Sequence, residues 1–382
     1  MDFKLNDSQK AIVKSARDFA YNDLLPGVLE RDRKGEYDIN LWKKLGELGF
    51  LGLPYPKEYG GTGNGYLEYV LALQEISKVD ASVGISYSIS TSVCCGGIYN
   101  YGNEEQKKKY LPALLNGESI GAFGLTEAGA GSDASNLKTV AEEKDDHYLL
   151  NGTKIFTTNG PYCKYYFVIA STDPTQGVRG LSAFVVDTDW EGVTVGAVED
   201  KMGLRSAQVS DMHFNNVKVP KENLLGEKGK GFVYAMESLD CGRVGIAAQA
   251  LGIAKGAFNE AFEYIQQREQ FGKPIYKNQY VSFKMAELKT KIQAAEFMLY
   301  NAAVLHDEGL PFSEEAAMAK LMCSDVAMEV TVEAVQFMGG NGYMKPYHVE
   351  RMMRDAKITQ IYEGTNEIQK LVISNSMFRK KK

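Results

Sequence analysis

The residues best suited to chemistry lie near the end of the chain, in the segment Ile361–Glu367. There the carboxylate of Glu363 lies between an aromatic residue, Tyr362, and Gly364. Partial burial of a carboxylate raises its pKa, which makes it a usable base near neutral pH. The glycine leaves the backbone open to close approach by a ligand. The pattern predicts that Glu363 is a general base in a partly desolvated site.

A second segment, Phe123–Asp133, is rich in glycine, alanine and hydroxyl-bearing residues. Small residues let backbone N–H groups approach a ligand, and the hydroxyls of Thr126 and Ser132 can add directed hydrogen bonds. The alternative is a tight loop between a helix and a strand. The segment does not fit a Rossmann fingerprint, because no strand and helix flank it in a βαβ unit. From these residues alone, both the binding and the loop interpretation stay open.

Two further segments carry arginine. In Leu239–Arg243, the side chains of Asp240 and Arg243 can form a structural ion pair or can face a ligand. In Gln267–Pro274, Arg268 has the planar guanidinium that suits a pyrophosphate. A basic residue at the end of a helix can equally complement the helix dipole, so this segment has a structural alternative too.

Three regions of different periodicity must position these segments. Residues 1–120 show apolar positions at i, i+3 and i+4 spacing, which predicts helices. Residues 121–225 contain short β-rich runs and the pair Asn151-Gly152, a strong signal for a hairpin turn. Residues 226–382 have long stretches without proline, typical of a bundle of long helices. We expect an α+β fold with three domains at these boundaries, the middle one an antiparallel sheet or barrel.

Composition excludes several classes of function. The net charge of −6 argues against a nucleic-acid surface, and the one basic run, Arg379–Lys382, is typical of a solvated tail. The four histidines are scattered, so we expect no metal site. No apolar stretch approaches the roughly 20 residues of a membrane helix, and the first residues do not form a secretory signal. Five irregularly spaced cysteines indicate reduced thiols, and we expect a cytoplasmic protein.

Together these segments resemble the flavin-dependent acyl-CoA dehydrogenase family, most closely its bacterial short-chain (butyryl-CoA) members. The likeness runs from the loop Lys57–Gly61 to Gln369, with the motifs in family order and spacing. Ala128 stands where the family usually has proline. The resemblance implies an N-terminal helical domain, a middle β domain and a C-terminal four-helix bundle, with FAD as the cofactor.

The resemblance also implies roles for individual residues. Glu363 would take the α-proton of an acyl-CoA, and Thr158 would hydrogen-bond flavin N5, which receives the hydride. Without the neighbouring motifs, Thr158 is simply a β-branched residue at a strand end. The residues that would contact FAD are Phe123, Leu125, Thr126, Gly131, Ser132, Phe156, Thr158, Arg268, Gln270, Phe271, Gln279, Gln336, Gly339, Gly340, Thr365 and Glu367. Those that would contact the substrate are Ser132, Asp240, Arg243, Tyr362 and Gly364.

Gly242 bears on the choice of base. Family members that act on isovaleryl-CoA or very long acyl chains carry their catalytic Glu at the position that matches Gly242. Glycine at this position leaves Glu363 as the only candidate base, and it provides some room for the acyl group.

The resemblance implies partners as well. FAD would be bound between neighbouring subunits of a homotetramer, a dimer of dimers, and electrons would pass to electron-transfer flavoprotein. No Lys or Arg lies between Lys78 and Lys107, a stretch that includes the segment 81–93, which matches the helix lining the acyl pocket. Relatives that use glutaryl-CoA place an Arg there, so we expect an uncharged and butyryl-like acyl group.

Several alternatives stay open. The same chemistry can run in reverse, as in an enoyl-CoA reductase, and branched, medium or aryl acyl groups would use the same residues. An oxidase or a desulfinase-like relative would share the fold. A non-catalytic scaffold is disfavoured, because Glu363, Arg268 and the glycines are all present.

Overall fold

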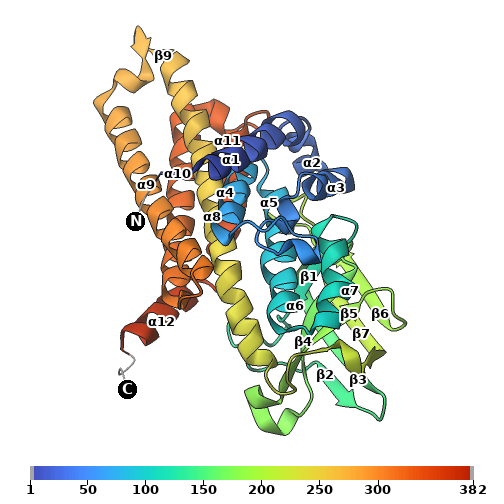
Figure 1. Cartoon of the computed structure of the whole chain (residues 1–382). Helices are drawn as coiled ribbons and strands as arrows, with labels where there is room; N and C mark the ends of the chain where they lie inside the picture. Colours follow the sequence, from blue (N-terminus) through green and yellow to red (C-terminus); the bar gives the residue numbers. More distant parts are fainter. Residues whose placement is uncertain (1–3, 379–382) are drawn as a thin grey trace.

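The computed structural model describes residues 4–378. Residues 1–3, at the start of the segment predicted not to form a secretory signal, and the basic run Arg379–Lys382, predicted to be a solvated tail, lie outside this part. Figure 1 shows three regions in chain order: a group of helices, a sheet, and a set of longer helices. The α+β organisation is therefore confirmed, while the boundaries 1–120, 121–225 and 226–382 stay predictions.

The first region is helical. It begins with a capping box, in which the side chains of Asn6 and Gln9 each accept a hydrogen bond from the other's backbone N–H. A π-helix, Ile89–Cys95, continues α5 directly into α6. The helices are α1 Asp7–Phe19, α2 Val28–Lys34, α3 Ile39–Glu47, α4 Tyr66–Ser77, α5 Ala81–Ser88, α6 Gly96–Tyr101 and α7 Glu104–Leu115.

The middle region is an eight-stranded sheet, which confirms the predicted sheet. Its strand order is β6-β7-β3-β2-β4-β5-β8, with β1 beside β4. Most neighbours are antiparallel, but β1 and β2 each pair with β4 in parallel. The strands are β1 Gly121–Gly124, β2 Val140–Glu143, β3 His147–Thr158, β4 Tyr165–Ser171, β5 Leu181–Asp187, β6 Val193–Val198, β7 Val209–Pro220 and β8 Leu224–Leu225.

The predicted hairpin turn at Asn151-Gly152 is wrong, because both residues lie inside β3. The chain reverses direction before this pair, in the turn between β2 and β3, where Lys144 N donates a hydrogen bond to His147 O at 2.8 Å. Gly152 lies at a register shift between β3 and β7 and has a φ of +147°. A Cβ on it would lie 2.4 Å from Thr139 Oγ1. Glycine at this position therefore permits a bulge and a close approach of strands.

The last region consists of three long helices followed by two shorter ones. Helix α8 has 37 residues and is about 55 Å long at 1.5 Å per residue. A small hairpin, β9–β10, joins α8 to α9. The elements are α8 Gly231–Gln267, β9 Glu269–Gln270, β10 Lys273–Pro274, α9 Gln279–Asp307, α10 Ser313–Met338, α11 His348–Ile358 and α12 Asn366–Met377.

Two apolar cores hold these regions together. The larger core joins the N-terminal helices to the long helices and includes the buried side chains of Trp42, Tyr69 and Leu251. The smaller core lies in the sheet, around Tyr166 and Phe184. Figure 1 places the sheet and the β9–β10 hairpin at opposite ends of the molecule.

Within residues 4–378, no helix combines the length and the apolar character needed to cross a membrane. In the same part of the chain, no group of three or more His, Cys, Asp or Glu residues is arranged to hold a metal ion. All five cysteines are buried and free.

Candidate active site

The turn between α11 and α12 carries Glu363. Its backbone is left-handed at two successive residues, with a φ of +53° at Glu363 and +85° at Gly364. Thr365 then caps α12, because its hydroxyl accepts a hydrogen bond from Ile368 N at 3.3 Å. Left-handed conformations are unfavourable for residues other than glycine and are concentrated at functional sites. The turn therefore holds Glu363 in a conformation that ordinary loop formation does not require.

The carboxyl group of Glu363 lies in a desolvated position. The residue as a whole is partly exposed, but its Oε2 is buried and has no hydrogen-bond partner in residues 4–378. Burial raises the pKa of Glu363 to about 7, against the opposing positive charges of Arg243 and Lys320. Near neutral pH the group can therefore both accept and release a proton.

Gly242 on α8 leaves the space that this carboxyl group occupies. A Cβ at Gly242 would lie 2.7 Å from Glu363 Oε2 and 3.2 Å from Val93 Cγ2. Val93 belongs to the π-helix Ile89–Cys95, so this helix also reaches the site. Helices with π geometry are frequent at functional sites. The π-helix was not anticipated, because its run of Ser, Thr and Cys residues has no distinctive period.

The sequence left open whether Arg243 forms a structural ion pair or faces a ligand, and its contacts are compatible with both. It forms an ion pair with Asp240, which also accepts a hydrogen bond from Ser313 Oγ at 3.1 Å. Arg243 is only 6% exposed, and its Nε has no partner in residues 4–378. Burial raises the pKa of Asp240, an effect that the Arg243 charge opposes. One donor of the guanidinium therefore stays available in the desolvated region that contains Glu363.

Three buried side chains that hold the turn were missed by sequence reasoning. Gln249 on α8 accepts a hydrogen bond from the Tyr362 hydroxyl and donates to Ala81 O at 2.7 Å. Lys320 Nζ on α10 donates to Gly364 O and to an Asn366 side chain. Gln369 Nε2 on α12 donates to the carbonyl oxygens of Glu363 and Gly364, at 3.1 and 2.8 Å. The only available signal was a polar residue in an otherwise apolar helical run, as at Lys320.

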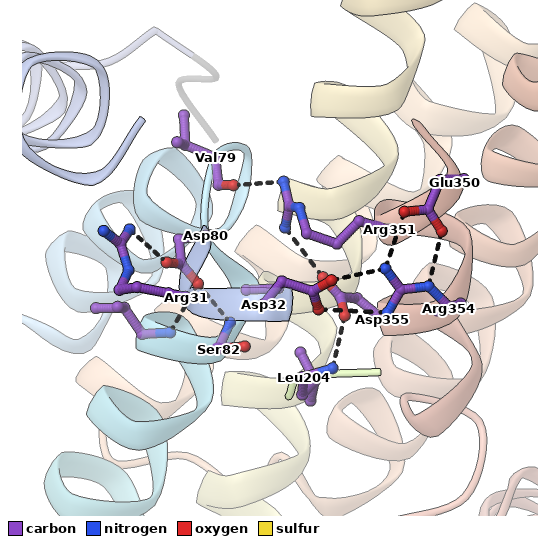
Figure 2. A network of polar contacts seen from close by, with 12 residues as sticks. Arg31, Asp32, Val79, Asp80, Ser82, Leu204, Glu350, Arg351, Arg354 and Asp355 are labelled. Atoms are coloured by element: carbon purple, nitrogen blue, oxygen red, sulfur yellow. Dashed lines mark hydrogen bonds and ion pairs between the residues drawn. The ribbon is translucent and has the colours of Figure 1, made fainter. Parts of the chain in front are cut away.

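Figure 2 shows a polar network that fixes α11, the helix before this turn. Asp355 accepts hydrogen bonds from Leu204 N at 2.6 Å and from Arg351 at 3.0 Å. Burial raises the pKa of Asp355 to about 6, while the Arg351 charge opposes the shift. Arg354 forms a further ion pair with Asp32 at 2.8 Å. The network ties α11 to α2 and to the segment before β7.

A second group of predicted site residues gathers at one edge of the sheet. Strand β1 leads into the glycine-rich segment, and Ile155 N donates to Thr126 O at 2.9 Å. This bond places Thr126 beside the end of β3, which carries Phe156 and Thr158. Phe156 has a φ of +56° and is 64% exposed. The structure therefore brings together the segments that contain Phe123, Leu125, Thr126, Gly131, Ser132, Phe156 and Thr158.

A buried ion pair lies beneath this edge, and sequence reasoning missed it. Lys154 Nζ donates to Glu127 Oε1 at 2.7 Å and to Leu125 O at 3.1 Å. Glu127 also accepts hydrogen bonds from the backbone N–H groups of Lys138 and Thr139, at 2.6 and 3.1 Å. Lys154 is 0% exposed, and burial lowers its pKa to about 8, although Glu127 opposes the shift. The pair pins the glycine-rich segment to β3.

Of the remaining predicted cofactor residues, Thr365 and Glu367 lie at the start of α12, beside the Glu363 turn, and the others form an outer group away from the sheet edge. Those between the end of α8 and the start of α9 lie around the β9–β10 tip, at the end of the molecule opposite the sheet (Figure 1). Phe271 there is 98% exposed and has a φ of +54°. The end of α10 is linked to the same part of α8, because Asn341 Nδ2 donates to Tyr264 OH at 3.0 Å. The exposed residues of this outer group are Arg268, Gln270, Phe271, Gln279, Gln336, Gly339 and Gly340.

Family models match almost the whole chain in three consecutive pieces. The N-terminal domain of acyl-CoA dehydrogenase matches residues 6–118, the middle domain 122–217 and the C-terminal domain 229–378.

Individual relatives are similar over their full length. A short-chain specific acyl-CoA dehydrogenase from Clostridium acetobutylicum is 48% identical over 99% of this chain and 100% of its own. The caffeyl-CoA reductase–Etf complex subunit CarC from Acetobacterium woodii is 43% identical over 98% of this chain and 99% of its own.

Solved structures give the same result. Butyryl-CoA dehydrogenase from Megasphaera elsdenii superposes with a TM-score of 0.98 at 50% identity, covering 99% of this chain and 100% of its own. A chain in a structure named for the electron transferring flavoprotein of Acidaminococcus fermentans has a TM-score of 0.98 at 51% identity, with 99% and 100% covered. With matches of this extent, the chain belongs to the acyl-CoA dehydrogenase family of flavin-dependent oxidoreductases.

Proposed function

We propose that this protein catalyses the FAD-dependent α,β-dehydrogenation of a short, uncharged acyl-CoA thioester to the trans-2-enoyl-CoA. The observation that carries the proposal is the carboxyl group of Glu363. Its buried Oε2 has no partner in residues 4–378, and it lies against the space left by Gly242. The names of the short-chain specific dehydrogenase and of butyryl-CoA dehydrogenase among the similar proteins support the choice of substrate.

In this proposal Glu363 removes the proton from the carbon next to the thioester. Because burial raises the pKa of Glu363 to about 7, a substantial fraction is carboxylate at neutral pH and is still basic enough to react. General base catalysis of this kind contributes roughly 10²–10⁴-fold. FAD, when bound, supplies the acceptor for the hydride that leaves the β-carbon, so the two lost C–H bonds are replaced by a double bond.

The backbone of the same turn can stabilise the thioester oxygen as it gains negative charge. The N–H of Glu363 has no acceptor within residues 4–378. The carbonyl oxygens of Glu363 and Gly364 are both held by Gln369, which fixes the orientation of the turn. We propose that this N–H donates to the thioester oxygen. Losing one donor of this type costs about 2.7–4 kcal/mol in comparable sites.

The segments proposed to hold FAD have room for it. A Cβ added at Gly131, Gly339 or Gly340 would meet no atom within 4 Å, so the backbone there is open to a ligand. At the sheet edge, Phe156 presents an exposed ring and Thr158 a hydroxyl. The Arg268 guanidinium suits the pyrophosphate.

A complete FAD site would need the outer group of a second copy, because one chain keeps the two groups at opposite ends (Figure 1). We propose a homotetramer built as a dimer of dimers. The ring of Phe271, which is 98% exposed in one chain, would then be covered by the second copy and its cofactor.

The acyl group is proposed to lie beside the π-helix Ile89–Cys95, which contributes no Lys or Arg. A distal carboxylate would lack a partner there, and burying it alone would be unfavourable. We propose electron-transfer flavoprotein as the electron acceptor. Two of the similar proteins carry its name, as Etf or in full.

The test is anaerobic reduction of the bound flavin by a panel of acyl-CoA esters. Butyryl-CoA should bleach the flavin of the wild type faster than octanoyl-, isovaleryl- or glutaryl-CoA. Glu363→Gln should bind FAD and butyryl-CoA but bleach at least about 10²-fold more slowly, since its amide cannot accept the proton. Near-normal bleaching by Glu363→Gln would refute the assignment of the base.

Reduction of an enoyl-CoA is a second candidate, favoured by the name of the caffeyl-CoA reductase subunit. The same Glu363 would then return a proton to the α-carbon. Measuring both directions with electron-transfer flavoprotein, with crotonyl-CoA and caffeyl-CoA as oxidants, separates the two candidates. In a reductase, an enoyl-CoA would reoxidise the reduced flavin much faster than the matching acyl-CoA reduces the oxidised flavin.

A further inference from the structure

Lys320 is buried next to the proposed base and has no role in the function described above. Its side chain lies on α10 and is 0% exposed. Its Nζ donates to Gly364 O and to Asn366 Oδ1, both at 2.9 Å. Lys320 therefore holds the second half of the α11–α12 turn, directly after Glu363.

The two acceptors do not depend on Lys320 for their hydrogen bonds. Gly364 O also accepts from Gln369 Nε2 at 2.8 Å, and Asn366 Oδ1 also accepts from Ser324 Oγ at 3.1 Å. An apolar side chain would leave neither oxygen unpaired, and it would avoid the cost of burying an ammonium group. The turn therefore does not need a lysine for satisfied hydrogen bonds, and a role for the positive charge accounts for it better.

That charge acts on Glu363. A nearby positive charge favours the carboxylate form of an acid. Arg243 and Lys320 both lower the pKa of Glu363, Arg243 more strongly. Arg243 shares its charge with Asp240 in an ion pair, whereas Lys320 forms no ion pair within residues 4–378. Burial lowers the pKa of Lys320 to about 7, although the Glu363 carboxylate opposes this shift, so the protonation of Lys320 and the ionisation of Glu363 favour each other. The other charged or titratable groups that act on this pair are Arg243 and Asp240 on α8, Asp325 on α10, Glu367 on α12, Tyr69 on α4, and Tyr362 in the turn.

We propose that Lys320 is a positioning residue. It holds the α11–α12 turn in the conformation that presents Glu363, and its protonated form favours the carboxylate form of Glu363. The inference rests on the proposed function of Glu363 as the base.

The test compares three variants of the FAD-loaded enzyme. Lys320→Met removes the charge and both donors, whereas Lys320→Gln removes the charge and keeps an N–H donor. Lys255→Met is the control, because Lys255 is a largely buried lysine of α8 that pairs with Glu296, away from the turn. Two quantities are followed against pH: kcat/KM with butyryl-CoA and, without substrate, the infrared band of the protonated Glu363 carboxyl, assigned with Glu363→Gln.

Both Lys320 variants should move the acid limb of kcat/KM and the infrared midpoint upward by about 1 pH unit, since a nearby opposite charge shifts a carboxyl by roughly 1–3 units. Lys320→Met should lose more kcat than Lys320→Gln, and Lys255→Met should move neither midpoint. Unchanged midpoints with only a lower unfolding temperature, or failure of both Lys320 variants to fold, would show a purely structural role and overturn the inference. A wild type that no acyl-CoA reduces would overturn the proposed function instead, and the infrared titration would still report on Lys320.

Discussion

Glu363 combines two unfavourable features at one residue. Its backbone is left-handed, and its buried Oε2 has no protein partner in residues 4–378. Three of the six non-glycine residues with positive φ in this part of the chain, Phe156, Phe271 and Glu363, belong to the predicted site. Strain of this kind persists only where the surrounding structure enforces it. At the residue scale, stability is therefore lower where the proposed chemistry takes place.

Glu363→Gln should accordingly stabilise the fold, more at alkaline than at acid pH. Because burial raises the pKa of this carboxyl from 4.5 to about 7, the wild type loses stability as the pH rises between these values. The amide of glutamine stays neutral, so the gain should be smaller at pH 5 than at pH 8, where about 1–3 kcal/mol is expected. Urea unfolding at both pH values measures it. An equal gain at both would mean that the carboxyl is not strained by desolvation.

At the scale of elements, the proposed site depends on helices and strands whose side chains hold short irregular segments in place through hydrogen bonds and ion pairs. Helices α8, α10 and α12 each send one buried polar side chain to the α11–α12 turn. Strand β3 grips the glycine-rich segment through the ion pair between Lys154 and Glu127. Segments rich in glycine are flexible by themselves, so these contacts give them a fixed shape before any ligand binds.

Lys154→Met tests the grip of β3. The change leaves the Glu127 carboxylate buried without its cation, and breaking such a pair typically costs about 3–5 kcal/mol. We expect the free energy of unfolding, measured with urea, to fall by that amount, and we expect FAD to be released faster. The double variant Glu127→Gln/Lys154→Met should recover part of the stability, since no charge is then left alone.

Lys144→Met is the matched control, because its pair with Glu142 is exposed at the surface. Its removal should change stability by less than about 1 kcal/mol. Similar losses for Lys144→Met and Lys154→Met would contradict the importance of burial.

At the scale of the whole molecule, the two groups of proposed cofactor residues lie at opposite ends. The sheet edge carries Thr126, Phe156 and Thr158, whereas Arg268 and Phe271 lie at the β9–β10 tip (Figure 1). The helical core between them is continuous, so folding of one chain cannot close this gap. Assembly of copies is therefore proposed to complete the site.

Arg268→Ala should weaken FAD binding without weakening the chain itself. Arg268 is exposed, and its backbone hydrogen bonds to Tyr264 and Ile275 do not need the side chain. Losing one charge-assisted contact of about 1.5–3 kcal/mol should raise the dissociation constant for FAD by tenfold or more. The rise in unfolding temperature on adding FAD measures this, with Lys273→Ala in the adjoining hairpin as the control. An unchanged rise would exclude Arg268 from the FAD site.

Sequence signals predicted the features that are local. Residue type and spacing were enough to predict the Tyr362-Glu363-Gly364 segment and the glycine-rich segment. The three regions were predicted in the same way, because periodicity is a local property of the chain. The contacts of Gln249 and Lys320 with the turn were not predictable, since they join residues 113 and 44 positions apart. Asn151-Gly152 misled because the same pair suits a turn or a bulge, and only the neighbouring Thr139 decides between them.

Helix α8 carries Arg243 about a third of the way along its length and ends beside Arg268. The two arginines are about 38 Å apart along the axis at 1.5 Å per residue. If each belongs to a different catalytic centre, as the proposed assembly requires, the length of α8 sets the distance between the two centres. A one-residue insertion between them would rotate one end against the other by about 100°, whereas seven residues would nearly restore the facing. The length of this helix is thus constrained by the spacing of the assembly as well as by the fold of one chain.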